Sequence, residues 1–223
     1  MSNIVPSRLV SSLLELVKID SPTGFEAKIS DYIFQHSGMV YTPTDYYRLE
    51  TRLNSLVKIF SANSVDEVYH MYKKNITPDM RAVLINISTN NETYFFRDVK
   101  PFSVFSKKVI PEIIEKYPVG PLNIWSAASS TGQEAYSLLM STKNNQGEAV
   151  LTRITLFASD ISTEALNKAR TGIYNGLDVQ RGLPVTDLMK YFTQLENENW
   201  QLDKNLINKV KFFEFNLLKN DRL

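Results

Sequence analysis

The chain has 223 residues, a formal net charge of +1, 43% hydrophobic residues and 22% charged residues, which is typical of a globular protein with one large or two small domains. It contains no cysteine, which excludes disulfides, a thiolate nucleophile and a cysteine-ligated metal, and its two histidines, His36 and His70, form no metal-ligand pattern. The near-neutral charge argues against binding nucleic acid over the whole surface, and no apolar run is long enough to cross a membrane. A reducing, cytoplasmic setting without membrane insertion is therefore expected.

The N-terminal part of the chain has the periodicity of helices and no evident chemistry of its own. An apolar stripe over residues 7–18 predicts a helix, which makes residues 1–25 an N-terminal helical extension. Residues 26–90 are expected to form a helical domain. Its helices are predicted over about 25–36, over 45–60, from 64 onwards, and over 78–87.

Two short patterns stand out within this helical domain. Glu67 follows Ser64 at the spacing of a capping box, which predicts a helix start at that point. Arg48 and Arg52 lie four residues apart on one side of the helix at 45–60. That pair indicates either a solvated helix face or a basic groove for an acidic partner.

A polar turn over residues 88–93 leads directly into three aromatic residues at 94–96 and then into Arg97. The aromatic residues are expected to follow a helix cap and to face the core. A guanidinium beside an apolar cluster normally has a carboxylate partner, so one is expected for Arg97. A helix over 102–117 follows, and the Pro-Val-Gly-Pro sequence at 118–121 ends it.

Residues 122–140 form a short apolar strand, a turn of small residues and an amphipathic helix. In an open α/β sheet this junction binds nucleotide-like ligands, because small side chains let the ligand approach the backbone and the helix N-terminus offers free N–H groups. Thr131 and Glu134 have capping-box spacing, which predicts the helix start. An ordinary strand-to-helix turn is the alternative, since Gly132 alone falls short of a glycine-rich fingerprint.

A second buried strand is expected over residues 153–160, after a polar loop at 143–148. It ends in Asp160, and Ser162 is placed to cap a helix over 163–170. An acid at the end of the second strand of a βαβ unit suits hydrogen bonding to ribose hydroxyls. As an aspartate before a helix, Asp160 is equally suited to be a capping residue.

The chain then departs from strand–helix alternation. Short strands are expected at 191–192 and at 200–202, inserted into the sheet domain, and a third clear strand at 210–218. Three parallel strands are too few for a complete doubly wound sheet.

Several blocks of sequence carry a resemblance when they are taken together and in order. They are Asn-Glu-Thr-Tyr-Phe-Phe-Arg at 91–97, Trp-Ser-Ala-Ala-Ser-Ser-Thr-Gly-Gln-Glu-Ala-Tyr-Ser at 125–137, Ala-Ser-Asp-Ile at 158–161, Val-Gln-Arg-Gly-Leu-Pro at 179–184, Lys-Tyr-Phe at 190–192 and Phe-Asn-Leu-Leu at 215–218. This ordered set resembles the CheR-type chemotaxis protein-glutamate O-methyltransferases over about residues 28–220.

The resemblance implies an α/β protein with an all-helical N-terminal domain. A Rossmann-like S-adenosylmethionine methyltransferase domain would follow over 91–223, with a small antiparallel β-subdomain at about 185–212. It also implies a cytoplasmic enzyme that methylates glutamate side chains on the cytoplasmic helices of methyl-accepting chemoreceptors. S-adenosylmethionine would be the cofactor and S-adenosylhomocysteine the product, with no metal and no nucleic acid involved.

Residue roles follow from the matched blocks. The resemblance implies cofactor binding by Asn91, Thr93, Arg97, Glu134, Asp160, Asn216 and Leu217. Among these, Asp160 would bind the ribose, Asn216 and Leu217 would border the adenine, and Arg97 would orient the substrate carboxylate as the catalytic residue. The helix with Arg48 and Arg52 would meet the acidic receptor surface.

The chemistry agrees with the absence of a catalytic histidine or cysteine. A glutamate carboxyl, with a pKa of about 4.3, is already anionic near neutrality, so the reaction depends on positioning and needs no general base. Family members continue past the Asn-Leu-Leu strand to a Cys-Arg-Asn-Val-like block. No such block occurs here, so the sheet is expected to be incomplete at the C-terminus and the chain to be a fragment or a natural short form.

Two alternatives remain at this stage. One is a catalytically inactive binding module with the same fold, which measurement of cofactor binding would distinguish. The other is a methyltransferase of this fold that acts on a different protein, which an assay of methyl transfer to receptor-derived helices would distinguish.

Overall fold

The computed structural model describes residues 25–218, without the side chains at 25–28, 43, 46–48, 50, 66, 69 and 73. The chain divides into two compact units, Met1–Ser88 and Thr89–Leu223. The helix predicted over 7–18, and the N-terminal extension of which it forms part, lie outside the described residues. Within the described part of the chain, no helix is both long and apolar enough to span a bilayer.

The first unit is helical, as its periodicity predicts. Its described elements are α2 (Phe25–Ser37), η1 (Pro43–Asp45), α3 (Tyr46–Ile59), α4 (Val65–Lys74) and α5 (Pro78–Ser88). Leucines at 49, 53 and 56 lie on one face of α3 and are fully buried, together with Ile33 of α2 and Leu84 of α5. Burial of this helical stripe forms a core separate from that of the second unit.

The predicted cap of α4 is half correct. The Ser64 hydroxyl accepts a hydrogen bond from the Glu67 main-chain N–H, as a helix N-cap does. The Glu67 carboxylate accepts from the main-chain N–H of Asn63 at 2.8 Å, one residue before the cap, so the reciprocal capping-box bond to Ser64 is replaced. The same carboxylate also accepts from Asn63 Nδ2 at 2.9 Å, and the two bonds to Asn63 lower the pKa of Glu67.

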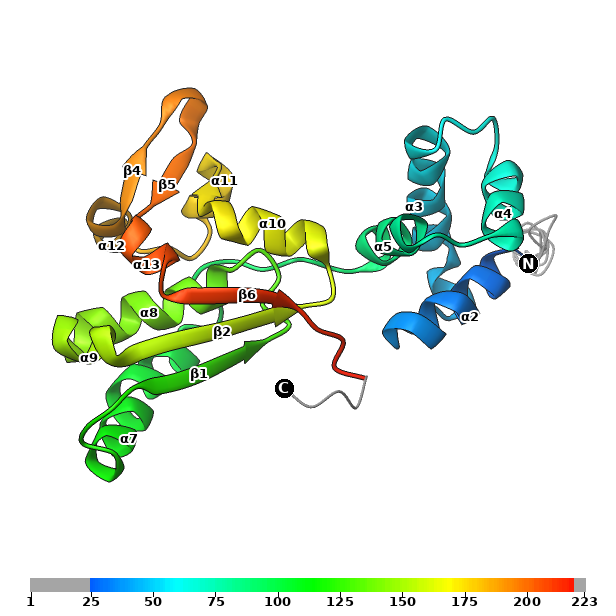
Figure 1. The fold of residues 1–223 in the computed structure, drawn as a ribbon. Coiled ribbons are helices and arrows are strands. Elements are labelled where there is room, and N and C mark those ends of the chain that lie inside the picture. The colour runs from blue at the N-terminus through cyan, green and yellow to red at the C-terminus, as the bar shows by residue number, and fades with distance from the viewer. Residues whose placement is uncertain (1–24, 219–223) are drawn as a thin grey trace, which may run out of the picture. The chain divides into compact units, whose positions relative to one another are not determined.

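The second unit contains a parallel sheet of β1 (Leu122–Ala127), β2 (Ile154–Asp160) and β6 (Val210–Glu214), in the order β1-β2-β6. Figure 1 shows the three arrows side by side and pointing the same way. The register pairs Ala127 with Ser159 and Asp160 with Glu214, so the carboxyl ends of all three strands meet at one edge. Helix α10 (Thr163–Thr171) packs against β2 and β6.

The helices that precede β1 and β2 in the chain differ from the sequence prediction in two places. The predicted loop at 143–148 is wrong, because α8 (Gln133–Gln146) continues to Gly147, which has φ +80°, and α9 (Glu148–Arg153) begins immediately after it. The helix predicted over 102–117 is present as α6 (Lys100–Val104) and α7 (Ile110–Lys116), with a π-helical turn, η2 (Phe105–Val109), between them.

The π-helical turn is held by polar side chains of α8. Ser141 donates to the Phe102 carbonyl at 3.0 Å, and Gln146 donates to the Ser106 carbonyl at 2.8 Å. Asn145 donates to the Ser106 hydroxyl at 3.1 Å. A widened turn disturbs the helical hydrogen bonds, and these side chains satisfy the carbonyl groups involved.

A second, antiparallel sheet has the order β3-β5-β4 and consists of β3 (Ile173–Tyr174), β4 (Phe192–Gln194) and β5 (Trp200–Leu202). The segments joining and following its strands are α11 (Gly176–Gln180), α12 (Val185–Tyr191), η3 (Glu196–Glu198) and α13 (Lys204–Ile207). The short strands expected near 191 and 200 therefore pair with each other and with β3, outside the parallel sheet. The mixed fold that the resemblance implies, a parallel sheet with a small antiparallel sheet, is confirmed.

Candidate cofactor site

The turn after β1 has an unusual backbone conformation. Three of its five residues have positive φ: Ala128 at +56°, Ser130 at +49° and Gly132 at +92°. Such a conformation is strained for residues with a side chain and persists only where its surroundings hold it. Here Ser129 N–H donates to the Ser159 carbonyl at 2.8 Å, and Gly132 N–H donates to the Ser129 carbonyl at 3.0 Å.

The start of α8 differs from the predicted capping box. The helix begins at Gln133 with Gly132 as N-cap, which agrees with the predicted start near Thr131, but the capping box predicted for Thr131 and Glu134 does not form. The reason is that the side chains have other partners. Thr131 Oγ1 donates to Gln133 Oε1 at 2.7 Å, and the Glu134 carboxylate accepts from the Ser126 hydroxyl of β1 at 2.8 Å. The N–H groups of this helix end thus remain available to a ligand.

Asp160 joins the turn to the end of β2. It is 8% exposed, and its two carboxylate oxygens accept from two main-chain N–H groups, those of Ser130 at 2.7 Å and Ser162 at 2.9 Å. The capping alternative made from sequence is wrong, because the N-cap of α10 is Ser162; Asp160 instead joins the turn to the residues before that helix. Its bond to ribose stays a prediction, since a carboxylate has further acceptor sites. Ser162 caps α10 by accepting from Ala165 N–H, as predicted.

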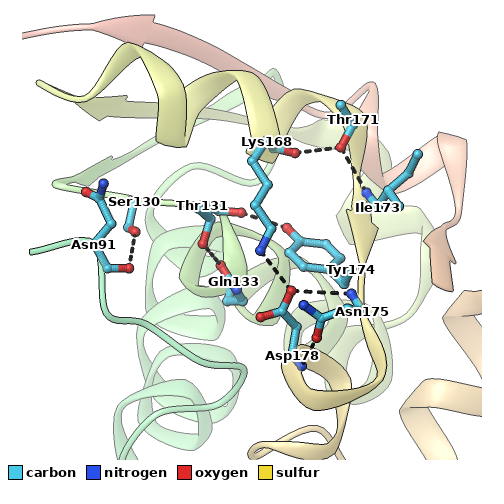
Figure 2. A network of polar contacts seen from close by, with 10 residues as sticks. All are labelled: Asn91, Ser130, Thr131, Gln133, Lys168, Thr171, Ile173, Tyr174, Asn175 and Asp178. Carbon is cyan, nitrogen blue, oxygen red and sulfur yellow. Dashed lines mark hydrogen bonds and ion pairs between the residues drawn. The ribbon is translucent and has the colours of Figure 1, made fainter. Parts of the chain in front are cut away.

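The segment at 91–97 is hydrogen-bonded to this turn at its first residue and to α8 near its other end. The Ser130 hydroxyl donates to the Asn91 carbonyl at 2.8 Å (Figure 2), and Asn91 Nδ2 donates to the Ser162 hydroxyl at 3.3 Å. Further along, Phe96 N–H donates to the Ser137 hydroxyl of α8 at 3.0 Å. Phe95 is fully buried, as expected for a core-facing aromatic residue.

Arg97 is exposed at the end of this segment. Its Cζ lies 5.8 Å from the ring centroid of Tyr94, and it forms no ion pair with any residue in 25–218 whose side chain is described. The carboxylate partner expected for it is therefore absent from this part of the chain. The nearby acid, Glu92, bonds instead to Arg181 at 2.5 Å.

Arg181 is a residue that sequence reasoning did not single out. Its Cζ lies 4.3 Å from the Tyr94 ring centroid, closer than that of Arg97. Its hydrogen bond and charge lower the pKa of Glu92, and the charge of Arg97 contributes in the same direction. The close packing of the Arg181 segment against the 94–95 segment depends on Gly182, which has φ +79°. A Cβ at this position would lie 2.1 Å from the Phe95 carbonyl oxygen. The only available signal was that the resembling blocks at 91–97 and 179–184 contain these residues.

Asn216 and Leu217 follow β6 at the same edge of the sheet. Phe215 N–H donates to the Asp160 carbonyl at 3.0 Å, which places the start of this segment beside the end of β2. Asn216 Oδ1 accepts from the Leu218 N–H at 3.0 Å, and Leu217 is 56% exposed. Thr93 is half-buried. The roles of these three residues toward a cofactor stay predictions.

The two arginines predicted to bind a partner lie in the first unit. The side chain of Arg48 is outside what the structure describes. Arg52 Nη1 donates to the Ser88 carbonyl at the end of α5 and to the Tyr41 hydroxyl, each at 2.5 Å. A cation at a helix C-terminus satisfies carbonyls that lack helical partners, so Arg52 has a capping contact in addition to its predicted role.

The features of the turn fit an adenosine-type cofactor better than an ordinary connection. The Ser129 hydroxyl is buried without a hydrogen-bond partner among residues 25–218, which is uncommon unless a ligand or water completes it. The uncapped first turn of α8 carries Glu134, and the ends of β2 and β6 present Asp160 and the 215–217 segment. These features define the class as an α/β domain that binds a nucleotide-like cofactor at the carboxyl edge of its parallel strands.

Comparison with known proteins defines the family. Residues 91–223 match the family described as CheR methyltransferase, SAM binding domain. The chemotaxis protein methyltransferase Cher2 of Pseudomonas putida is 33% identical over 185 residues, which cover 81% of this chain and 67% of the relative. Chemotaxis protein methyltransferase 1 of Vibrio cholerae is 31% identical over 191 residues, 85% of this chain and 69% of the relative. A chemotaxis protein methyltransferase of Salmonella typhimurium is 29% identical over 223 residues, 98% of this chain and 75% of the relative.

The chain belongs to the CheR methyltransferase family. The resemblance inferred from the sequence blocks is thereby confirmed, as is the assignment to S-adenosylmethionine-dependent methyltransferases of chemotaxis.

Proposed function

We propose that this chain transfers the methyl group of S-adenosylmethionine to glutamate side chains on the cytoplasmic helices of chemoreceptors, in the cytoplasm. The observation that carries the proposal is the exposure of Arg97 and the absence of an ion-pair partner for it among the described residues. Its guanidinium is exposed and without an ion-pair partner in the described part of the chain, on a segment bonded to the cofactor turn at Asn91 and to α8 at Phe96. A planar guanidinium is matched to a carboxylate, which is the reacting group of glutamate.

The surroundings of Arg97 support a positional role. Glu92, the acid that would compete for it, is engaged by Arg181, so the charge of Arg97 is not neutralised within the 92–97 segment. When bound, S-adenosylmethionine supplies an activated methyl group on a sulfonium. The protein then has to hold a carboxylate oxygen in line with that methyl, which is a task of orientation. Asn91, Thr93, Arg97, Glu134, Asp160, Asn216 and Leu217 would hold the cofactor, with S-adenosylhomocysteine as product, and Arg97 would also orient the substrate.

The test is methyl transfer to a purified receptor cytoplasmic fragment with methyl-labelled S-adenosylmethionine. Glutamyl methyl esters release methanol in alkali, whereas N-methyl groups do not, so base-labile label is the expected result. At saturating S-adenosylmethionine, Arg97→Ala should lower the rate of transfer by about tenfold or more, the effect of losing one charge-assisted contact in the transition state, and should lower the affinity for S-adenosylhomocysteine by a smaller factor. Lys100→Ala, which removes an exposed cation a few residues away, is the control and should transfer normally.

Two results would contradict the proposed reaction: base-stable label on the receptor, and absence of transfer by a chain that binds S-adenosylhomocysteine. Unchanged transfer by Arg97→Ala would refute the role of Arg97 in orienting the carboxylate.

A further inference from the structure

The antiparallel sheet is linked to the cofactor turn by one buried hydrogen bond. Tyr174, the last residue of β3, is fully buried, and its hydroxyl donates to the Thr131 carbonyl at 2.8 Å (Figure 2). Burial raises the pKa of Tyr174 well above its usual value, with a contribution from neighbouring Tyr136 and Asp178, so the hydroxyl remains a protonated donor. The bond joins residues 43 positions apart in the sequence.

This bond acts on the peptide group most free to rotate in the turn. The peptide between Thr131 and Gly132 has a glycine at φ +92° on one side, and glycine gives the backbone more than one orientation at little cost. Its N–H donates to the Ser129 carbonyl, and its carbonyl accepts from Tyr174. With both ends bonded, the peptide has one orientation, and the uncapped first turn of α8 follows directly from it.

Tyr174 is itself held firmly. Its ring makes edge contacts with Phe95 and Phe192, at centroid distances of 5.0 and 6.3 Å. The residues after it form a capping box in which Asn175 and Asp178 bond reciprocally, and Asp178 also accepts from Lys168 of α10 at 2.8 Å (Figure 2). A donor fixed in this way can hold the carbonyl that it bonds.

We propose that Tyr174 is a positioning residue for the cofactor: through Thr131 it fixes the backbone of the turn, so the antiparallel sheet contributes to S-adenosylmethionine affinity without touching the ligand. This inference rests on the cofactor binding that defines the family and is independent of the glutamate substrate. When the turn is already ordered before the cofactor binds, less free energy is spent on ordering it during binding, and the affinity for the cofactor is higher.

The experiment compares Tyr174→Phe with Tyr136→Phe by calorimetric titration of S-adenosylhomocysteine. Tyr136 is the matched control, because it is also fully buried and its hydroxyl also donates to a main-chain carbonyl at 2.8 Å, that of Ala169 in α10. Both variants lose one hydroxyl that donates to a main-chain carbonyl. The Ala169 carbonyl still accepts from the Gly172 N–H at 3.1 Å, so Tyr136→Phe should lower the melting temperature by no more than Tyr174→Phe does. Tyr174→Phe should lower the affinity for S-adenosylhomocysteine by about tenfold, which corresponds to the loss of one hydrogen bond. Tyr136→Phe should lower it by less than about twofold.

A second pair of variants covers the case in which Tyr174→Phe does not fold. Asp178→Ala removes the carboxylate that accepts from Asn175 N–H and from Lys168, and so loosens the segment after Tyr174. Asp203→Ala removes the N-cap of α13, where the carboxylate accepts from Asn205 N–H. Asp178→Ala should weaken binding by about threefold and Asp203→Ala should leave it unchanged.

Equal affinities within each pair would overturn the proposal, as would losses that follow only the fall in melting temperature. If the contrast between the variants persists while receptor methylation fails, the substrate proposal is wrong and this one stands.

Discussion

Replacing Gly132 by alanine tests the packing beneath the cofactor turn. The new Cβ would lie 3.0 Å from Ala169 Cβ, 3.1 Å from the Tyr136 ring and 3.3 Å from the Phe212 ring. None of these is the flexible end of a long side chain, and the residue must also keep φ at +92°. The left-handed backbone costs about 1–2 kcal/mol and forced overpacking about 1–3 kcal/mol, so the second unit should lose about 2–5 kcal/mol of unfolding free energy.

Gly120→Ala is the matched control, because it isolates the cost of the left-handed backbone conformation from the cost of packing. Gly120 has φ +91°, and a Cβ there would meet nothing within 4 Å. It should cost about 1–2 kcal/mol, because only the conformational strain remains. Urea unfolding followed by circular dichroism measures both variants, and titration with S-adenosylhomocysteine measures the site. Equal losses of stability in the two variants would refute the packing argument, and unchanged affinity in a folded Gly132→Ala would refute the placement of the site at this turn.

Two further predictions concern buried hydroxyl groups. Ser129→Ala removes a buried hydroxyl without a partner in the described part of the chain, so the melting temperature should stay level or rise while S-adenosylhomocysteine binds several-fold more weakly; a large loss of stability would contradict this. Burial raises the pKa of Tyr191 to about 12, above the value of about 10 expected in the unfolded chain, so its stabilisation of the native state is complete below pH 10 and is lost as the pH rises towards 12. Alkaline unfolding of Tyr191→Phe should therefore depend less steeply on pH between about 10 and 12 than that of wild type, and identical profiles would be inconsistent with the assignment.

Periodicity was sufficient for the main elements of the fold and insufficient for their ends. The strands and the leucine stripe of α3 could be predicted because burial on one face leaves a repeating pattern. The capping box of Thr131 and Glu134 was not a reliable prediction, because Glu134 bonds to Ser126 of the neighbouring strand, a tertiary contact that competes with the local capping pattern. The polar run at 143–148 was interpreted as a loop because its hydrogen bonds to the π-helical turn are not visible in the sequence.

The candidate site shows the same division. Asp160, Ser162 and the small residues of the turn could be singled out because each follows a strand directly. The bond between Glu92 and Arg181 could not be predicted, since 89 residues separate the two and each alone is an ordinary surface charge. Likewise, nothing in the sequence connects Tyr174 to Thr131. Contacts of this kind depend on how the two sheets pack.

The polar seam between α8 and the π-helical turn determines how these two helices can move. Most helix pairs meet through apolar side chains, which tolerate small sliding motions because one methyl contact resembles another. Here Ser141, Asn145 and Gln146 reach particular atoms of Phe102 and Ser106, so a shift by one residue would break several hydrogen bonds at once. These hydrogen bonds therefore fix the register of α8 relative to the π-helical turn. Because Ser137 of the same helix bonds to Phe96, the position of the segment that carries Arg97 is set by hydrogen-bond matching along α8.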